Sequence, residues 1–360
     1  MRPLVVGIDA RELLGARTGV GRYLGELMTR WLSRPDAGSR HFILYTPSPM
    51  DLRFEGSVDM RVCPGKPGTW WEQTTLSAAV RRDDPDVFFA PAYTAPVSLA
   101  APLAVTIHDV SFSRHPEWFR PREGMRRRWL TRHAARRAAV VLTVSQFSAA
   151  EIRALYGVPA ERIVVVPNGL TRRVPGEGRR EPVVFYAGSI FNRRNLPDLI
   201  AAFARVLPSV PGASLVIVGA DRTWPPQRLR EHAVSCGVLP HVQFREYVAE
   251  DELAELYARA SVFAFLSEYE GFGLTPLEAL SARVPIVVAD TPVAREIYGD
   301  AASFVPLHDI DAAAAALRRL LTDERAREEQ LARSTAVLSR YSWDAAADTT
   351  LAHLERIARR

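Results

Sequence analysis

The chain has 360 residues, of which 48% are hydrophobic, and this length and apolar content favour two globular domains over a disordered or fibrous protein. Its 46 basic and 41 acidic side chains give a formal charge of +5, and two cysteines are too few for a disulfide framework. No run approaches the roughly 20 apolar residues that span a bilayer, and the N-terminus lacks the pattern of a signal peptide. We therefore expect a cytoplasmic protein.

Short β-rich runs alternate with helical stretches along the first half of the chain. The candidate strands are Leu4–Asp9, Phe42–Tyr45, Val87–Ala90, Ala104–His108, Val140–Val144 and Ile163–Val166. Alternation of this kind predicts a parallel sheet that is covered by helices on both faces.

The same pattern restarts after residues 171–182, a segment with two prolines, two glycines and six charges that reads as a linker. The strands expected beyond it are Val183–Ala187, Ser214–Val218, Val242–Phe244, Val262–Phe265, Ile286–Ala289 and Ser303–Val305, with helices such as Leu196–Val206 and Asp251–Ala260 between them. We predict an α/β protein with two Rossmann-like domains, residues 1–170 and 183–340, whose parallel sheets face each other across a cleft. Residues 341–360 form a helix that could pack back on the N-terminal domain.

The most informative segment is 265–280, which follows a strand and opens a helix. Thr275 is expected to cap this helix, with Glu278 three residues further on. Gly271 and Gly273 allow a ligand to approach the backbone closely, and the free N–H groups of the helix start suit a phosphate. A capping box with a tight turn and no ligand explains the same residues equally well.

The spacing of Glu270 and Glu278 inside Glu-Gly-Phe-Gly-Leu-Thr-Pro-Leu-Glu-Ala resembles the signature of retaining GT-B glycosyltransferases, specifically family 4 (glycosyl transferases group 1) and its mannosyltransferase-like branch. Further motifs extend the resemblance over nearly the whole chain: Gly19–Tyr23, Ile107–Asp109, Val144–Ser148, Val166–Gly169 and Ala187–Leu196. The resemblance implies the GT-B fold and transfer of a hexose from a nucleotide-diphosphate sugar.

The resemblance also implies roles for individual residues. Glu278 corresponds to the carboxylate that holds the donor ribose, Glu270 to the one that contacts the transferring sugar, and Arg194 to the diphosphate-binding lysine. The expected donor-binding residues are Gly19, Gly21, Gly188, Arg193, Arg194, Glu270, Gly271, Phe272, Gly273, Leu274 and Glu278, and the expected catalytic residues are His108, Glu270 and Arg194.

Several of these positions admit a second interpretation. His108 could be an ordinary loop histidine, although Asp109 beside it and the resemblance favour a hydrogen bond to the donor sugar. Gly19 and Gly21 could simply start a helix. Ser189 stands where some relatives carry an arginine, so Arg193 either compensates or faces solvent.

Two further features need an interpretation: a residue that departs from the family pattern before a strand, and a sequence that looks like a metal motif. Arg283 occupies a position where the family usually has glycine before the next strand. Asp84-Pro-Asp86 looks like the Asp-x-Asp metal motif of other glycosyltransferases, but it lies at a natural turn before a strand. We therefore expect no metal and no cofactor, with arginines and helix dipoles supplying the positive charge.

The segment Arg120–Arg137 carries eight arginines with Trp118 and Trp129 nearby. It could be a solvated helix, a surface for an anionic membrane or a polyprenyl-diphosphate acceptor, or a nucleic-acid site. No nucleic-acid-binding module accompanies it, so we expect no nucleic-acid partner. The prediction is peripheral contact with the inner face of an anionic membrane.

Three other functions compete with the transferase. A phosphorylase with a pyridoxal cofactor needs a lysine, and Lys66, the single lysine, lies in a Pro-Gly-rich stretch. The Glu-Gly-Phe-Gly motif argues against a nucleotide-sugar epimerase, and its intact carboxylates argue against a non-catalytic sugar-nucleotide-binding subunit. GDP-mannose is the first donor to test, and the acceptor could be a glycan, a lipid-linked sugar or a small molecule.

Overall fold

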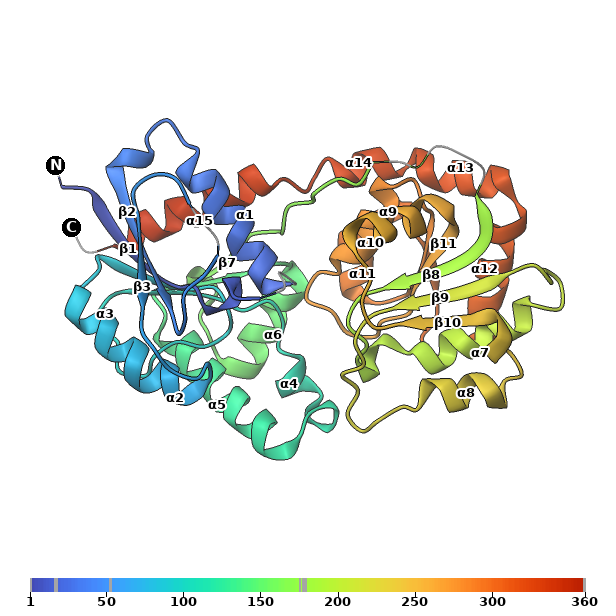
Figure 1. Cartoon of the computed structure of the whole chain (residues 1–360), viewed down its shortest axis with the longest axis horizontal. Coiled ribbons are helices and arrows are strands. Elements are labelled where there is room, and N and C mark those ends of the chain that lie inside the picture. The colour runs from blue at the N-terminus through green and yellow to red at the C-terminus, as the bar shows by residue number, and fades with distance from the viewer. Residues whose placement is uncertain (1, 16–18, 52–53, 175, 177–179, 359–360) are drawn as a thin grey trace. The chain divides into compact units, whose positions relative to one another are not determined.

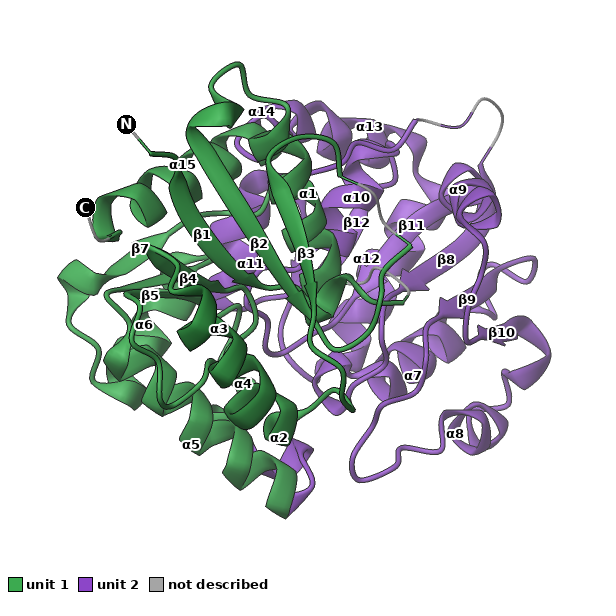
Figure 2. Ribbon diagram, turned by 60° about the vertical axis from the view of Figure 1, so that its left-hand side comes forward, with its two compact units in different colours: residues 1–114, 122–169, 342–360 green, residues 115–121, 170–341 purple. Residues whose placement is uncertain are grey.

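The computed structural model describes residues 2–15, 19–51, 54–174, 176 and 180–358 and divides into two compact units (Figure 1, Figure 2). Unit 1 contains Met1–Arg114, Arg122–Gly169 and Ser342–Arg360, and unit 2 contains His115–Pro121 and Leu170–Tyr341. The chain therefore passes from one unit to the other more than once.

Unit 1 is built on a seven-stranded sheet in the order β3-β2-β1-β4-β5-β6-β7, with every neighbouring pair parallel. The strands are β1 (Leu4–Asp9), β2 (Arg40–Thr46), β3 (Val58–Val62), β4 (Val87–Ala90), β5 (Leu103–Thr106), β6 (Val140–Thr143) and β7 (Ile163–Val165). The six expected strands are present. The prediction missed the edge strand β3, because the polar Asp59 and Arg61 interrupt its apolar pattern. It also extended β5 too far, since His108 lies in the loop that follows the strand.

Helices from several parts of the chain complete unit 1. They are α1 (Val20–Leu32), α2 (Thr69–Trp71), the adjoining π-helical turn η3 (Glu72–Leu76), α3 (Ser77–Asp83), α4 (Ser111–Arg114), α5 (Pro121–Arg137), α6 (Gln146–Tyr156) and α15 (Trp343–Ile357), with short turns η1 (Arg11–Leu13), η2 (Ala37–Ser39) and η5 (Ala160–Arg162). The C-terminal helix α15 lies beside α1, where the Trp31 indole donates to the Ala347 carbonyl at 2.9 Å (Figure 1). Trp343 and Leu354 are buried in the same core as Leu27. The C-terminal helix is thus part of unit 1.

Unit 2 is built on a six-stranded parallel sheet in the order β10-β9-β8-β11-β12-β13. The strands are β8 (Glu181–Ala187), β9 (Ser214–Val218), β10 (Val242–Arg245), β11 (Ala260–Phe265), β12 (Ile286–Ala289) and β13 (Ser303–Val305). The helices are α7 (Leu196–Val206), α8 (Leu229–Ser235), α9 (Glu250–Arg259), α10 (Leu274–Ser281), α11 (Pro292–Tyr298), α12 (Ile310–Thr322), α13 (Glu324–Ala332) and α14 (Ser334–Leu338), with short turns η4 (Pro116–Trp118), η6 (Asn192–Arg194), η7 (Leu239–His241) and η8 (Gly299–Ala301). Two Rossmann-like units with parallel sheets confirm the predicted fold class.

The segment expected as a linker makes extensive contacts within unit 2. The Arg180 guanidinium donates to the carbonyls of Tyr257, Ala260 and Ala282 at 2.7, 2.8 and 2.8 Å. β8 begins at Glu181, inside the same segment, while residues 175 and 177–179 lie outside the described part. Arginine side chains therefore anchor the described part of this segment.

Two whole-chain expectations can be compared with the structure. Within the described ranges, no helix is long and apolar enough to cross a membrane. Cys63, which is buried, and Cys236, which is partly exposed, are both free thiols.

The sheets also fix where ligands can bind. In parallel sheets of this type, ligands lie beyond the carboxyl ends of the strands. β8 and β11 are neighbours in the sheet, so the loops that follow them, 188–195 and 266–273, leave the same edge side by side.

Candidate donor site

Glu270 is the centre of the polar cluster beyond β8 and β11. The Nη1 atom of Arg194 pairs with its Oε1 atom, the Nε atom of Arg193 lies 3.6 Å from the same oxygen, and the Ser267 hydroxyl donates to it at 2.6 Å. The side chains of Glu270, Arg193 and Arg194 are each only 11–12% exposed. Arg193 therefore lies beside Glu270 and does not face the solvent, while its contact with a donor stays a prediction.

Backbone contacts join the two loops that carry this cluster. The Glu268 amide donates to the Arg193 carbonyl at 2.9 Å, and the Asn195 side chain donates to the Leu266 carbonyl at 3.1 Å. The Arg194 guanidinium also lies over the Phe265 ring, 4.4 Å from its centroid. The arginines are thus held in place before any ligand binds, which lowers the entropic cost of binding one.

Gly188 begins the first of these loops and lies next to the second. A Cβ atom on Gly188 would meet Thr275 of α10 at 3.9 Å, so the loop borders the first turn of that helix. A Cβ atom on Gly219, after β9, would lie 1.9 Å from the Gly188 carbonyl oxygen. Neighbouring strand ends therefore meet backbone to backbone here, and a side chain at Gly219 would push the loop away.

The start of α10 differs from the prediction. The N-cap is Gly273, with φ of 85°, and the helix begins at Leu274, so Thr275 is its second residue and not its cap. The expected capping box is therefore wrong: Gly273 adopts the left-handed conformation that starts the helix two residues earlier. No side chain caps this end, although the Tyr298 hydroxyl donates to the Gly273 carbonyl at 2.9 Å. The helix start thus remains suited to an anionic group.

The neighbouring residues contribute through their backbone. The Phe272 ring is buried and packs edge-on against Tyr341 with 5.1 Å between ring centroids. Gly271 is buried as well. The Phe272 side chain is therefore withdrawn from a ligand, and backbone contacts by Gly271, Phe272, Gly273 and Leu274 stay a prediction.

Glu278 lies on α10 with a partner that the sequence did not reveal. Its carboxylate is 4% exposed and lies 3.3 Å from Nη2 of Arg173. Arg173 also pairs with Glu250 at 2.6 Å and lies over the Tyr257 ring at 4.7 Å. Because Arg173 falls in the charged segment expected as a linker, nothing in its sequence context distinguished it from solvated neighbours.

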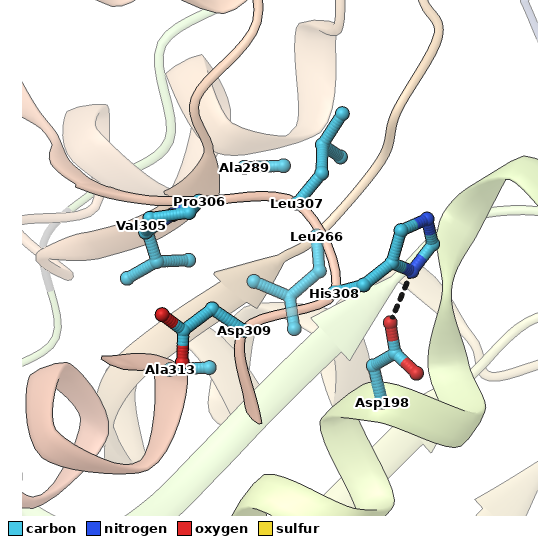
Figure 3. A pocket seen from close by; sticks show the side chains of 9 residues that line it. All are labelled: Asp198, Leu266, Ala289, Val305, Pro306, Leu307, His308, Asp309 and Ala313. Atoms are coloured by element: carbon cyan, nitrogen blue, oxygen red, sulfur yellow. Dashed lines mark hydrogen bonds and ion pairs between the residues drawn. The ribbon is translucent and has the colours of Figure 1, made fainter. Parts of the chain in front are cut away.

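His308 is the centre of a second polar cluster, next to the loop 266–273 (Figure 3). Its Nδ1 atom lies 2.8 Å from Asp198 of α7, and its Nε2 atom lies 3.6 Å from Glu268. The hydrogen bond that His308 donates to Asp198 raises the pKa of His308, and burial raises the pKa of Glu268. The adjoining cavity of about 10 Å³ has room for about one water molecule. His308 therefore links the loop 266–273 to α7, and the cavity beside it is too small to hold a sugar.

His108, the expected catalytic residue in unit 1, lies just beyond the end of β5. The His108 Nε2 atom is 2.9 Å from the Pro91 carbonyl, which can only accept, so Nε2 carries the proton and Nδ1 is the ring's acceptor. Burial lowers the pKa of His108, which keeps the ring neutral near pH 7. The rings of Tyr23 and Tyr93 lie edge-on to it at 5.0 and 5.6 Å.

Gly19 and Gly21, the two glycines of the N-terminal loop, are needed for different structural reasons. Gly19 is the N-cap of α1 with φ of 50°, and a Cβ atom there would meet nothing within 4 Å. A Cβ atom on Gly21 would lie 2.3 Å from the Glu12 carbonyl oxygen. Gly21 thus lets α1 pack against η1, and a donor contact by either glycine stays a prediction.

Asp84 and Asp86 have structural roles. Asp84 ends α3 in the left-handed conformation, and buried Asp86 accepts from the Val5 amide at 2.9 Å and from Arg2 at 2.6 Å. Across the residues that the structure describes, no group of three or more His, Cys, Asp or Glu side chains could hold a metal ion.

The comparisons with known proteins agree with this architecture. The family model described as Glycosyltransferase Family 4 matches residues 17–173, and the one described as Glycosyl transferases group 1 matches residues 169–336. The chain belongs to the GT-B glycosyltransferases. The segments of this glycosyltransferase that match the two family models overlap at residues 169–173, where the chain passes from unit 1 to unit 2.

Its relatives include two named mannosyltransferases. O-antigen chain mannosyltransferase B of Escherichia coli is 30% identical over 66% of this chain and 66% of its own length. MMP alpha-(1->4)-mannosyltransferase of Mycolicibacterium hassiacum is 29% identical over 71% of this chain and 65% of its own length. The chain therefore spans just under two thirds of the length of these relatives.

Solved structures share the fold at lower sequence identity. WaaG, a glycosyltransferase involved in lipopolysaccharide biosynthesis, superimposes with a TM-score of 0.77 at 17% identity over 98% of this chain and 99% of its own. Anabaena HepE in complex with UDP and glucose gives a TM-score of 0.75 at 18% identity over 99% and 100%.

Proposed function

We propose that this glycosyltransferase moves a hexose from a nucleotide-diphosphate sugar to an acceptor hydroxyl with retention of configuration, and that unit 2 holds the donor. The observation that carries the proposal is the convergence of Arg193 and Arg194 on Glu270, beside the uncapped start of α10. A diphosphate carries more negative charge than one carboxylate and accepts guanidinium donors in pairs. It would draw the arginines from Glu270, whose carboxylate would then accept hydrogen bonds from sugar hydroxyls.

The transfer itself uses no protein nucleophile. The acceptor oxygen bonds the anomeric carbon, the bond from that carbon to the phosphate oxygen breaks, and the nucleoside diphosphate leaves with the electron pair. The acceptor proton passes to the departing phosphate on the same face of the sugar, which accounts for retention. Arg193, Arg194 and the start of α10 stabilise the negative charge that develops on that phosphate.

Glu278 and His108 complete the proposed donor contacts. Glu278 accepts from the ribose hydroxyls, and Arg173 holds its carboxylate in position. His108, neutral and with Nδ1 as its acceptor, receives a hydrogen bond from a hydroxyl of the transferring sugar. A protonated ring would lose this acceptor, so the lowered pKa of His108 suits the role.

The donor proposed first is GDP-mannose. The relatives named as mannosyltransferases support the sugar, and the HepE complexes with UDP and UDP-glucose make uridine donors the comparison to include. Thermal-shift measurements with GDP-, UDP- and dTDP-sugars test the choice. A donor at 100 times its dissociation constant adds about 2.7 kcal/mol of stability. The absence of a shift with all of these donors, in a folded protein, would refute the proposed function.

Variants of Arg194 make the test specific to the diphosphate. Arg194→Ala should weaken donor binding about tenfold or more, since a charged hydrogen bond contributes about 1.5–3 kcal/mol, and Arg194→Lys should keep much of the affinity. Arg259→Ala is the matched control, because Arg259 is an exposed arginine of unit 2 that pairs with Glu181. Normal donor affinity in Arg194→Ala would transfer the role to Arg193.

We also propose peripheral contact with an anionic membrane through the outer face of α5. Helical spacing puts Arg122, Met125, Trp129 and Arg132 on one side of this helix, and Met125 and Trp129 are 57% and 60% exposed. Exposed aromatic and basic side chains on one helix face suit a lipid headgroup region.

Vesicle co-sedimentation tests the membrane contact. Binding should require anionic lipid, weaken with salt, and fall in an Arg122→Glu/Arg132→Glu variant. Arg136 and Arg137 are not part of the tested face, because they donate to the carbonyls of Tyr156 and Leu99 within unit 1. Equal recovery in the supernatant with neutral and anionic vesicles at low salt would exclude the contact.

A further inference from the structure

Unit 1 contains a polar cavity that the donor proposal leaves unused. Its volume is about 420 Å³, within the range of about 300–1,000 Å³ typical of small-molecule sites. The walls come from the loop after β1, the start of α1, the loop after β4, the segment around α2, and α5. Its charged lining consists of Arg11, Glu12, Glu72, Glu123, Arg126 and Arg127, and Thr69 and Thr94 add hydroxyl groups.

One end of the cavity is rich in hydrogen-bond acceptors. Arg11 lies 2.8 Å from Asp9 and also pairs with Glu72, and both carboxylates are almost fully buried. Glu72 accepts further hydrogen bonds from the Thr94 hydroxyl at 2.6 Å and from Gln73 at 2.7 Å. Two carboxylates thus share one guanidinium. Of the two, Glu72 lines the cavity, and its carboxylate suits a ligand that brings hydroxyl donors.

The other end is positively charged. Arg126 is exposed at the rim, and the Arg127 guanidinium lies 5.0 and 5.1 Å from the ring centroids of Tyr93 and Phe112. Glu123 lines the same cavity one turn earlier on α5, yet within the described residues neither arginine pairs with it or with another carboxylate. Two unneutralised guanidinium groups on one wall suit an anionic group, and phosphate most of all.

Tyr93 joins this cavity to His108. Its ring lines the cavity, lies 5.6 Å from the His108 ring, and its hydroxyl donates to Asp109 at 3.2 Å. Its backbone is left-handed, with φ of 62°, a conformation that bulky residues rarely adopt. The cavity therefore lies one aromatic ring away from the residue proposed to contact the transferring sugar.

We propose that this cavity binds the acceptor, and that the acceptor is a sugar carrying a phosphate group. Its hydroxyls face Glu72 and Thr94, and its phosphate lies between Arg126 and Arg127. The inference rests on the proposed transferase function and adds the chemical class of its second substrate. Both a soluble sugar phosphate and a lipid-linked sugar phosphate present this chemistry.

Calorimetry on the whole chain tests the proposal without requiring turnover. The probes are the 1- and 6-phosphates of mannose, glucose and galactose, the free hexoses, inorganic phosphate, and a polyprenyl phosphosugar in detergent. At least one phosphorylated probe should bind about tenfold or more tightly than its free hexose, since charge-assisted hydrogen bonds are lost without the phosphate. Binding of the soluble or of the lipid-linked probe identifies the source.

Variants on α5 identify the site. Arg127→Met removes the charge but keeps an apolar side chain over Tyr93, and Arg126→Glu reverses a charge at the rim. Both should lower the affinity for the phosphorylated probe about tenfold or more, whereas Arg82→Glu, the same charge reversal at an exposed position of α3 outside the cavity, should not.

Nucleotide binding separates this inference from the function on which it rests. GDP or UDP affinity should be equal in all these variants, because the nucleotide residues belong to unit 2. A chain that binds nucleotide sugar but no phosphorylated probe overturns the acceptor inference alone. So does unchanged probe affinity in both Arg126→Glu and Arg127→Met. A chain that binds no nucleotide sugar refutes the transferase function itself.

Discussion

Substitution of Gly273 tests how the start of α10 is held. In Gly273→Ala the new Cβ atom would lie 2.1 Å from the Tyr298 hydroxyl, and the backbone would keep φ of 85°. The left-handed conformation costs a non-glycine residue about 1–2 kcal/mol. Displacing the buried hydroxyl breaks its hydrogen bond to the Gly273 carbonyl and adds about 1–3 kcal/mol. We expect a loss of about 3 kcal/mol in the free energy of unfolding.

The double variant separates the two contributions. Tyr298→Phe alone removes the hydrogen bond and should cost about 1.5 kcal/mol. In Gly273→Ala/Tyr298→Phe the Cβ atom faces the Cζ carbon of residue 298 at 3.4 Å and the Cε1 carbon of Phe265 at 3.8 Å, which are ordinary contacts. The double variant should therefore be about 1–2 kcal/mol more stable than the sum of the single losses predicts.

Urea denaturation of the four proteins measures this coupling. Equal m values in all four justify the comparison of midpoints. Nucleotide affinity provides a second reading, because a displaced α10 start should weaken diphosphate binding in Gly273→Ala and recover in part in the double variant. Losses that add within about 0.5 kcal/mol would show that the hydroxyl does not hold the turn.

Four further outcomes are expected. Donor hydrolysis or transfer should persist in excess EDTA, and a loss that Mg²⁺ restores would contradict metal independence. Glu278→Ala should weaken nucleotide binding in calorimetry, and unaltered affinity in a folded variant would exclude the ribose contact. Arg283→Gly should stabilise the chain by about 0.5–1 kcal/mol in urea denaturation, because Arg283 has φ of 60° and glycine avoids most of that strain; a lower midpoint would contradict this. The Asp198 bond raises the pKa of His308 above 6.5, so its stabilising effect is complete below pH 6.5 and is lost as the pH rises above it. The midpoint difference between the natural chain and His308→Asn, which tolerates the left-handed backbone, should therefore shrink from about pH 5.5 to about pH 8.5, and a constant difference would exclude the ionic contact.

Much of the fold follows from local patterns in the sequence. The twelve expected strands are present because buried parallel strands such as Val87–Ala90 and Ile286–Ala289 are continuous apolar runs. The edge strand β3 lacks that signal, since only one side of it is paired. The end of β5 was placed too late, because Ile107 is apolar whether it lies in a strand or in a buried loop.

The site was less accessible to the same reasoning. The spacing of Gly273 and Thr275 is compatible with either residue as the cap, and only the tertiary contact from Tyr298 favours Gly273. Arg173 is distant from Glu278 in sequence, so their pairing depends on how the chain returns to α10. Likewise the cavity beside Arg127 is lined by side chains from segments that are distant in sequence, so local sequence patterns do not predict it.

The return of α15 to unit 1 has a consequence for how the chain folds during synthesis. All the strands and helices of unit 2 precede residue 342, so its core can close while translation continues. Most of unit 1 is synthesised before unit 2. Its helix α1 nevertheless cannot bury Trp31 and Leu27 against Ala347 and Leu354 until α15 has left the ribosome. The apolar groove along α1 therefore stays open throughout the synthesis of unit 2. A nascent chain that stalls between the end of unit 2 and α15 would expose this apolar surface to chaperones. The exposed surface lies in unit 1, the unit that is synthesised first.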